Sequence, residues 1–376
     1  MGEIITEYKE TVDSDCTLPI LTSSKTEGVI LQEEHFGRKQ QHDITGYNIL
    51  PRNYCTYRNR SDGVDFTFNI NKCCDKGIIS KFYPVFSGNN SDVFFLSLVL
   101  NNSEEVVHEI AYTCTGTGQK VLSFLDLQKM KVRVPGFDEQ KKIAAYFDDL
   151  DHLITLHQRK CEDTKKLKKY MLQKMFPQNG SKVPEIRFKG FTDDWEQRKF
   201  GSLLDETKNK TSVEDEDTLL SCAINGMYLN SELFSHFRGA SNVGYLKVKK
   251  NDLILSAQNL HLGNCNVNLR FEHGIISPAY KVYELVDCNP LFMQAWVKRD
   301  STKNFFLRAS TEGASVCRKN IVWEELYKQE LLVPDIEEQK KIGAYFDYLD
   351  HLITLHQNKC EELKKIKKYM LQNMFV

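Results

Sequence analysis

The acidic, histidine and cysteine side chains of this sequence could support catalysis, but none of them forms a set with usable spacing. Pro334 and Asp335, followed by Glu338 and Lys340, imitate the Pro-Asp…Glu-x-Lys signature of metal-dependent nucleases. Their spacing is too tight for that signature, and they open a helix-like stretch. The run Asn-Pro-Leu-Phe at 289–292 falls short of the motif of adenine methyltransferases, and no Gly-x4-Gly-Lys-Ser/Thr phosphate loop occurs. The sequence therefore predicts no catalytic residue in this chain.

The cysteines do not predict a metal site either. Eleven of them are scattered along the chain without any Cys-x-x-Cys pair, which is typical of reduced thiols and argues against zinc. The N-terminal stretch is acidic and unlike a signal peptide, and no apolar run is long enough to cross a bilayer. We expect a cytoplasmic chain with no membrane contact and no bound metal or cofactor.

Basic, amide and aromatic side chains are interleaved in loop-like stretches of both halves. Arginine suits guanine edges, asparagine and glutamine suit adenine, and lysine suits phosphates. The alternative for each residue is an ordinary solvated surface, and the net charge of −1 does not by itself indicate DNA binding. The candidate DNA-binding residues are Arg38, Lys39, Gln41, Arg52, Asn53, Tyr57, Arg58, Arg60, Arg238, Asn242, Lys247, Lys249, Gln258, Asn259 and His261.

The elements that would position these residues are organised around one stretch that occurs twice. Residues 134–176 and 333–375 match at 33 of 43 positions, with a constant offset of 199. This period is far too long for a solenoid repeat. We therefore expect two copies of a unit that joins a domain to a helix: domains at 1–133 and 200–332, helices at 134–176 and 333–376, and a linker at 177–199.

Each copy of the repeat has the pattern of a long helix. A proline precedes it, acids fill the first turn and lysines crowd the last turns, which complements the helix dipole. Apolar positions alternate at spacings of four and three, which is typical of a coiled-coil seam. About 38 residues would span roughly 57 Å. The expected pairing residues are Ile143, Phe147, Leu150, Ile154, His157, Ile342, Phe346, Leu349, Ile353 and His356.

Two points about these helices stay open from the residues alone. Near-identical seams favour an antiparallel pair with pseudo-twofold symmetry, and the alternative is two separate helices that each pack on their own domain. His157 and His356 could meet at the seam and fix its register, or they could be solvated at its edge. The domains themselves share few residues beyond Gly-Ile-Ile-Ser at 77–80 and 274–277, so the scaffold is duplicated and the surfaces differ.

These features resemble the specificity subunit of type I DNA restriction–modification systems. The resemblance covers essentially the whole chain. It is carried by the Pro-x-x-x-Glu-Gln-Lys-Lys-Ile helix starts at 135–143 and 334–342 and by the central Arg-Phe-Lys-Gly-Phe…Trp-Glu-Gln-Arg-Lys-Phe-Gly segment at 187–201. The Gly-Ile-Ile-Ser stretches and the Gly-Thr-Gly-Gln turn at 116–119 are also typical.

The resemblance implies an α+β fold with two similar α/β target-recognition domains, separated by two helices that pair as an antiparallel coiled coil. Each domain would read one half of a bipartite site in double-stranded DNA, and the helices would set the spacer. Two modification subunits would dock on the helices and linker, and restriction subunits would join them. S-adenosylmethionine, ATP and Mg would belong to those partners, and the assembled complex would be the nuclease and adenine methyltransferase.

One departure from the family pattern and one rival interpretation accompany this expectation. The central linker normally has a counterpart ahead of the first domain, whereas here Met1-Gly2 aligns directly with Phe200-Gly201. Either the central linker serves both halves or the start is truncated, and symmetric docking of the first domain is in doubt. The rival is a coiled-coil scaffold, such as an orphan or antirestriction relative, whose domains bind proteins and which lacks salt-dependent DNA affinity.

Overall fold

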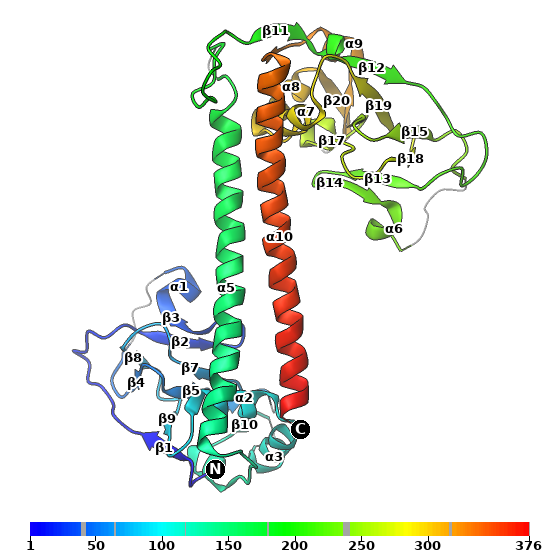
Figure 1. Cartoon of the computed structure of the whole chain (residues 1–376). Helices are drawn as coiled ribbons and strands as arrows, with labels where there is room; N and C mark the ends of the chain where they lie inside the picture. The colour runs from blue at the N-terminus through cyan, green and yellow to red at the C-terminus, as the bar shows by residue number, and fades with distance from the viewer. Residues whose placement is uncertain are drawn as a thin grey trace. The chain divides into compact units, whose positions relative to one another are not determined.

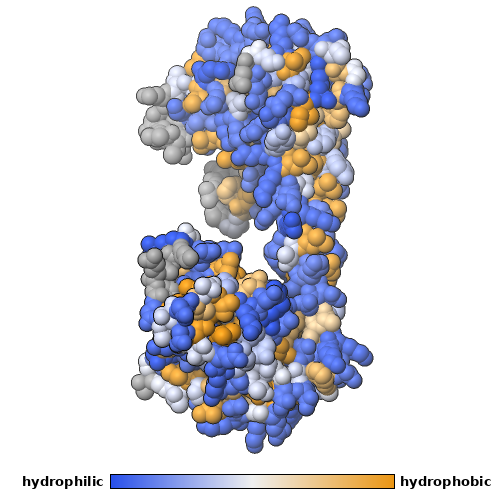
Figure 2. Space-filling view, turned by 90° about the vertical axis from the view of Figure 1, so that its left-hand side faces the viewer, coloured by the Kyte–Doolittle hydropathy of each residue, from blue (hydrophilic) through white to orange (hydrophobic). Residues whose placement is uncertain are grey.

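The computed structural model describes residues 1–38, 43–63, 65–116, 118–178, 180–235, 241–315 and 318–375. The chain forms two compact units. Unit 1 comprises Met1–His157 with Asn358–Val376, and unit 2 comprises Gln158–Gln357. Each unit holds one domain together with part of α5 (Phe137–Lys174) and part of α10 (Ile336–Met374) (Figure 1). Hydrophilic residues cover most of the face drawn in Figure 2, and apolar residues gather there only in small groups.

The domain of unit 1 is built on a four-stranded antiparallel sheet in the order β1-β9-β5-β7, accompanied by two-stranded ribbons. Its strands are β1 (Ile5–Tyr8), β2 (Leu21–Ser24), β3 (Gly28–Leu31), β4 (Asn48–Pro51), β5 (Cys55–Tyr57), β6 (Arg60–Ser61), β7 (Phe68–Ile70), β8 (Lys76–Ile79), β9 (Val85–Gly88) and β10 (Lys120–Val121). Its short helices are α1 (Gln32–Phe36), α2 (Val93–Asn102), α3 (Glu104–Thr113) and α4 (Phe124–Lys129).

The domain of unit 2 repeats this plan around the sheet β12-β19-β16-β17. Its strands are β11 (Glu196–Lys199), β12 (Leu204–Thr207), β13 (Leu220–Ala223), β14 (Gly226–Leu229), β15 (Leu246–Lys249), β16 (Leu253–Ser256), β17 (Cys265–Val267), β18 (His273–Ile276), β19 (Tyr280–Leu285), β20 (Ser310–Ser315), β21 (Arg318–Ile321) and β22 (Glu330–Val333). Its short helices are η1 (Phe200–Leu203), α6 (Asn230–Leu233), η2 (Leu260–Leu262), α7 (Pro290–Val297), α8 (Asp300–Arg308) and α9 (Trp323–Lys328).

The two domains share their element order as well as their sheets. The ribbon β2-β3 corresponds to β13-β14, and β4-β8 corresponds to β15-β18. Two consecutive helices then follow, and α4 or α9 precedes the long helix. Even single parallel bridges recur, Ile20 with Ile78 and Leu219 with Ile275. The expected α+β class with two similar domains is therefore confirmed.

Close packing explains why the Gly-Ile-Ile-Ser stretch recurs although most of the domain sequence does not. A Cβ on Gly77 would lie 2.5 Å from Cδ1 of Leu21, and one on Gly274 would lie 2.6 Å from Cδ1 of Leu220. In both places a backbone carbonyl oxygen also lies within about 3 Å of the added carbon. The two isoleucines that follow are fully buried in each unit, so this strand holds the ribbons β4-β8 and β2-β3 together in unit 1, and β15-β18 and β13-β14 in unit 2.

In unit 1 the first half of α5 pairs with the end of α10 (Figure 1). Phe147, Leu150 and Ile154 of α5 form a core with Cys360 and Leu363 of α10 and with α2. The ammonium of Lys367 donates to Asp151 at 2.5 Å. Apolar burial supplies most of the pairing energy, since partly exposed ion pairs contribute little.

In unit 2 the end of α5 pairs with the first half of α10, so the helices are antiparallel in both units, as expected. Lys168 donates to both carboxylate oxygens of Asp350, at 2.5 and 2.6 Å. These residues are the repeat counterparts of Lys367 and Asp151, so each copy's aspartate meets the other copy's lysine. The Sγ of buried Cys161 lies 3.9 Å from the carbonyl oxygen of Ile353.

The predicted pairing residues differ in burial. Phe147, Leu150, Ile154, Ile342, Phe346 and Leu349 are buried, whereas Ile143, His157, Ile353 and His356 are half-buried. The role of the two histidines in register stays a prediction. Across the described ranges, no helix combines the length and the apolarity needed to cross a bilayer.

Candidate nucleic-acid interface

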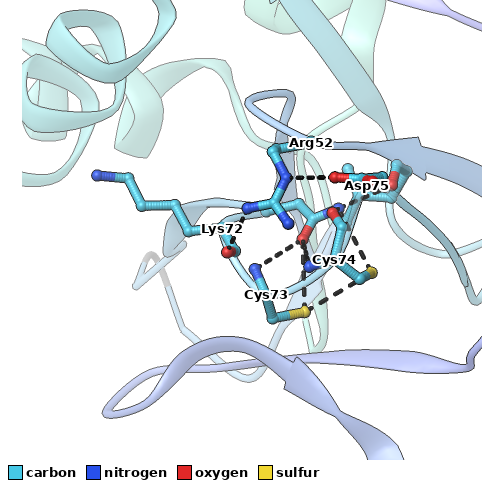
Figure 3. Close-up of polar contacts among 7 residues, drawn as sticks. Arg52, Lys72, Cys73, Cys74 and Asp75 are labelled. Atoms are coloured by element: carbon cyan, nitrogen blue, oxygen red, sulfur yellow. Dashed lines mark hydrogen bonds and ion pairs between the residues drawn. The ribbon is translucent and has the colours of Figure 1, made fainter.

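Arg52 lies in the turn that follows β4 and is held there by neighbouring groups (Figure 3). Its Nε donates to Asp75 Oδ1 at 2.8 Å and its NH1 donates to the carbonyl oxygen of Lys72 at 2.9 Å. The side chain is still 44% exposed. Arginine has five N–H donors, so Arg52 is oriented by two of them and keeps others for an outside acceptor.

A buried asparagine shapes this turn and has a counterpart in unit 2. The side chain of Asn71 accepts from the backbone N–H of Cys73 at 3.1 Å and donates to the carbonyl oxygen of Leu50 at 2.9 Å. Asn268 accepts from Phe271 and donates to Lys249 in the same way. The two turns are therefore held by the same asparagine hydrogen bonds, and they present different side chains.

The loop after β5 gathers cations around an exposed aromatic ring. The guanidinium carbon of Arg60 lies 4.6 Å from the ring centre of Phe82, and the Lys81 ammonium lies at 5.9 Å. The backbone N–H of Asn59 donates to the carbonyl oxygen of Phe82 at 2.9 Å, which ties the two loops together. The Asn59 Oδ1 is buried and has no hydrogen-bond partner within the described residues. Arg58 is exposed beside them, so this loop offers hydrogen-bond donors and a ring face.

Phe82 did not stand out in the sequence. Its signal was a Lys-Phe pair directly after the first Gly-Ile-Ile-Ser stretch, which is a loop position in the repeated plan. An exposed aromatic at a loop next to arginines fits contact with a base or a sugar. The sequence instead suggested Tyr57 as an aromatic DNA contact, and the structure corrects this expectation. The Tyr57 ring is fully buried, and its hydroxyl donates to the carbonyl oxygen of Leu122 at 3.1 Å.

The corresponding loop of unit 2 follows β16 and carries different polar groups. The backbone N–H of Ala257 donates to the carbonyl oxygen of Ala279 at 3.0 Å, which repeats the Asn59–Phe82 bond. Gln258 is exposed, and Asn259 and His261 are half-buried. Neither the His261 Nδ1 nor the Asn264 Oδ1 has a partner in the part of the chain that the structure describes. Burial, followed by the nearby Lys319, lowers the pKa of His261, so its ring is neutral at pH 7.

The lysines predicted on unit 2 share one face of β15 and are paired with acids. Lys247 and Lys249 alternate with buried residues along the strand. Lys247 pairs with Glu216 and holds the pKa of that carboxyl at about 2, and Lys249 pairs with Glu284 at 2.9 Å. A phosphate would have to compete with these carboxylates, which makes this face a weaker anion site than its lysine count suggests.

Asn242 was expected to contact DNA, and the structure corrects this expectation because the residue is buried and holds a loop together. Its side chain is 3% exposed. Its Nδ2 donates to Asp215 Oδ1 at 2.7 Å and its Oδ1 accepts from the backbone N–H of Asp215 at 2.8 Å. Both ends of its amide therefore bond to Asp215 and close a loop, so neither is available to DNA.

The remaining candidates of the sequence analysis are only partly described. Arg38 is exposed after α1. Three predicted residues, Lys39, Gln41 and Arg238, lie outside the described residues.

A second basic surface of unit 2 was not predicted. A groove of about 1200 Å³ is lined by Lys165 and Lys169 of α5 and by Lys298 and Arg299 after α7. Lys298 donates to the carbonyl oxygens of Ile224 and Cys265, at 2.7 and 3.0 Å, and the Arg299 guanidinium lies over the Phe176 ring at 4.5 Å. The lysines of α5 face solvent, so the open side of the groove is positively charged.

Comparisons with known proteins agree with this architecture. Residues 14–165 match the type I restriction modification DNA specificity domain. Two relatives from Methanocaldococcus jannaschii are each 22% identical: the putative type I restriction enzyme MjaX specificity subunit, over 67% of this chain and 60% of its own length, and the MjaVIII specificity subunit, over 68% and 64%. The chain thus matches less than two thirds of the length of each relative.

The fold is also similar to that of a solved structure. The type I restriction–modification S subunit from M. genitalium aligns with 100% of this chain and 94% of its own, with a TM-score of 0.57 and 12% identity. At that identity the likeness concerns the fold alone. The comparisons therefore show a type I restriction modification DNA specificity domain at residues 14–165, in a chain that is similar to type I specificity subunits.

Proposed function

We propose that the chain is a non-catalytic, sequence-reading subunit that binds double-stranded DNA in the cytoplasm. Each domain reads one half of a bipartite site, and the paired helices set the spacer between the halves. Two modification subunits dock on the helices and linker, and restriction subunits complete the complex. S-adenosylmethionine, ATP and Mg bind those partners, and the assembled complex cleaves DNA and methylates adenine.

The observation that carries this proposal is a repeated scaffold with different loops. The stretch after β5 holds Arg58, Asn59 and the first residue of β6, Arg60, while the equivalent stretch after β16 holds Gln258 and Asn259. Buried asparagines and close-packed glycines keep the two supports alike. Two copies of one scaffold that present different hydrogen-bonding groups can read two different short sequences.

The side chains divide into two proposed roles. Arg58 and Arg60 suit guanine edges in one half-site, and Gln258 and Asn259 suit adenine edges in the other. Arg52 suits the DNA backbone, because the bonds to Asp75 and Lys72 fix its direction. The backbone contacts would dominate affinity and the loop contacts would dominate sequence preference.

The test is a band-shift selection with the full chain, co-expressed with a modification subunit of its own system. A random bipartite DNA library is offered at two salt concentrations. We expect two short fixed elements around a fixed gap, over a salt-sensitive background. Binding without enrichment would contradict sequence reading, and no binding at either salt would favour a protein-binding scaffold.

Exchange of one domain tests whether each domain recognises its half-site independently. Residues 1–133 are replaced by the first domain of another family member, and the selection is repeated. Only one element of the recovered site should change, because the other domain keeps its own loops. Changes in both elements would rule out independent reading, and the reciprocal exchange of residues 200–332 is the matched control.

Shortening the helices tests how the spacer is set. Removal of residues 155–161 and 354–360 takes one heptad from each helix at equivalent positions and keeps the alternation of the seam. The loss is about 10 Å of helix, or about three base pairs at roughly 3.4 Å each. The gap should shorten while both elements stay the same. An unchanged gap would exclude the helices as the spacer-setting element.

A further inference from the structure

The groove of about 1200 Å³ in unit 2 carries more cations than its own acids compensate. Five basic and two acidic side chains line it, a net charge of +3, in a chain whose net charge is −1. Lys168 pairs with Asp350 at 2.5 Å, and Asp300 pairs with Lys303 at 3.1 Å. The other basic residues of the lining form no ion pair within the described ranges. We name them the groove cations: Lys165, Lys169, Lys298 and Arg299.

Two groove cations are half-buried at the junction of α7 and α8. The Lys298 ammonium donates to the carbonyl oxygens of Ile224 and Cys265, which uses two of its three hydrogens. The side chain of Arg299 makes no hydrogen bond to the described residues, and its Nε is buried. Burial lowers the pKa of Arg299 to about 10, so the guanidinium is still charged at pH 7. Unit 2 therefore holds a partly desolvated positive charge that none of its described carboxylates neutralises.

The position of Arg299 is unfavourable for the fold itself. Arg299 is the N-cap of α8, and its side chain makes no capping bond. Arginine has no acceptor atom, and a positive charge at a helix N-terminus opposes the helix dipole. By contrast, the half-buried Arg187 of the same unit donates to both oxygens of the buried Glu338 carboxylate, at 2.7 and 2.8 Å. An anion from outside the chain would compensate Arg299 in the same way.

The equivalent junction of unit 1 shows that the shared plan does not need cations there. No lysine or arginine occurs in α2 or α3. The side chain of Asn101 accepts from the backbone N–H of Phe68 at 2.9 Å and donates to its carbonyl oxygen at 2.8 Å. Ser103 is the N-cap of α3 and accepts from the backbone N–H of Val106. The junction is thus neutral and bonded internally in unit 1, and cationic and open to the groove in unit 2.

The groove adjoins the loop after β16, which carries the proposed reading residues of unit 2. That loop ends where β17 begins, at Cys265, whose carbonyl oxygen accepts from Lys298. Asn266 of β17 donates to the carbonyl oxygen of Ala223 at 2.6 Å, which ties this strand to the β13-β14 ribbon beside the groove. A DNA strand that contacts the loop therefore has its backbone within reach of the groove cations.

The size of the groove favours an extended polyanion over a single small ion. Its volume of about 1200 Å³ exceeds the roughly 300–1,000 Å³ of ordinary small-molecule sites. Lys165 and Lys169 lie on successive turns of α5, about 6 Å apart along the helix axis, and both are exposed. Cations spread along a groove in this way suit the evenly spaced charges of a DNA strand.

We propose that the groove cations bind the sugar–phosphate backbone of DNA beside the half-site contacted by the loop after β16. This inference rests on the DNA binding proposed above, and it assigns that binding a backbone site on α5 and the α7–α8 junction. Contacts of this kind position a protein on the duplex and carry no sequence information. The groove cations therefore set affinity, and the loop sets sequence preference.

The first test is the salt dependence of DNA binding by a variant with Lys165→Gln and Lys169→Gln, co-expressed with the modification subunit. Each lost phosphate contact removes about 0.9 from the slope of log affinity against log salt, so the slope should fall by about 1.8. Selected and random duplexes should be weakened equally. The matched control is Arg159→Gln with Lys166→Gln, because these residues lie on the same helix, pair with Asp163 and do not line the groove. The control should leave the slope unchanged.

The second test is Arg299→Ser, which separates a DNA contact from a structural role. Serine is the N-cap of the equivalent helix α3 and a preferred capping residue, so the thermal midpoint should stay the same or rise. Affinity for the selected duplex should nevertheless fall about tenfold or more, because bonds to a charged group are lost. Added DNA should slow hydrogen exchange at residues 299–303 in the parent chain and not in the variant. Equal affinity and equal salt slope in the parent and the variant would overturn the proposal.

The remaining outcomes distinguish other occupants of the groove. Loss of the modification subunit from the variants, with an unchanged salt slope, would identify a protein-docking groove and overturn the proposal. Slower exchange at residues 299–303 with ATP and not with DNA would do the same in favour of a small polyphosphate.

Failure of the groove and failure of sequence reading give different results. A reduced slope on random duplex without sequence enrichment would support the groove and remove the reading function. Sequence enrichment with an unchanged slope would leave the reading function and overturn the groove, and no binding to any duplex would overturn both.

Discussion

Replacing Arg187 with alanine should destabilise unit 2 strongly, because it leaves a buried carboxylate without its cation. The Arg187 side chain is 13% exposed and Glu338 is 0% exposed. Both guanidinium bonds are lost, and the Trp195 indole stays as a neutral donor. Glu338 raises the pKa of Arg187 through these bonds, so the arginine is charged at any working pH.

The size of the effect follows from burial rather than from the number of bonds. Breaking one side of a buried ion pair costs about 3–5 kcal/mol, whereas an exposed pair contributes about 0–1 kcal/mol. Arg159→Ala is the matched control, since Arg159 pairs with Asp163 at 3.8 Å on the exposed side of α5. Arg187→Ala combined with Glu338→Gln should recover part of the loss, because it removes the uncompensated charge.

Hydrogen exchange followed by mass spectrometry is the suitable assay, because a chain of two units need not unfold in one step. A loss of about 3 kcal/mol should speed exchange through local opening more than a hundredfold. The effect should appear in β11, in β22 and at the start of α10. If Arg187→Ala and Arg159→Ala changed the exchange of these segments equally, the assignment of Arg187 as the compensating cation would be wrong.

Three further outcomes are expected. Burial raises the pKa of Asp252 to about 6, so the folded state binds its proton more tightly and stability falls as pH rises from about 4 to about 6. Asp252→Asn should remove that dependence in urea unfolding at pH 4.5 and 7.5. Gly274→Ala should lower stability by about 1–3 kcal/mol through overpacking, while Gly63→Ala, which meets nothing within 4 Å, should not change the thermal midpoint. Arg60→Ala should weaken binding to the selected DNA by about 1–3 kcal/mol, and Arg159→Ala should leave it unchanged.

The helices illustrate what could be predicted from the sequence. The repeat, the seam spacing and the charge polarity predicted helices at 134–176 and 333–376, and the structure has them at Phe137–Lys174 and Ile336–Met374. Helical periodicity is a property of near neighbours, so it is readable in one chain. The Gly-Ile-Ile-Ser repeat was readable for the same reason, although its cause, contact with a leucine more than 50 residues away, was not.

The residues of the candidate interface were harder to predict from the sequence than the helices. Tyr57 and Asn242 have the side chains of DNA-contacting residues, yet their polar groups bond to Leu122 and Asp215 inside the domain. Phe82 looked like a core residue by type, yet it lies exposed under Arg60. Residue type and spacing alone do not distinguish these cases, because burial depends on what the rest of the fold brings to that position.

The repeat alone is enough to infer two copies of one plan, each with a long helix and with unlike loops. The pairing of the helices and the burial of each helix start follow from the folded chain. Glu139 and Glu338 stand in nearly identical sequences, and one is exposed while the other is fully buried beneath Arg187 and Trp195. The reason is that a local sequence fixes the helix, whereas the partner of a side chain comes from a segment more than 140 residues away, and that contact exists only in the folded chain.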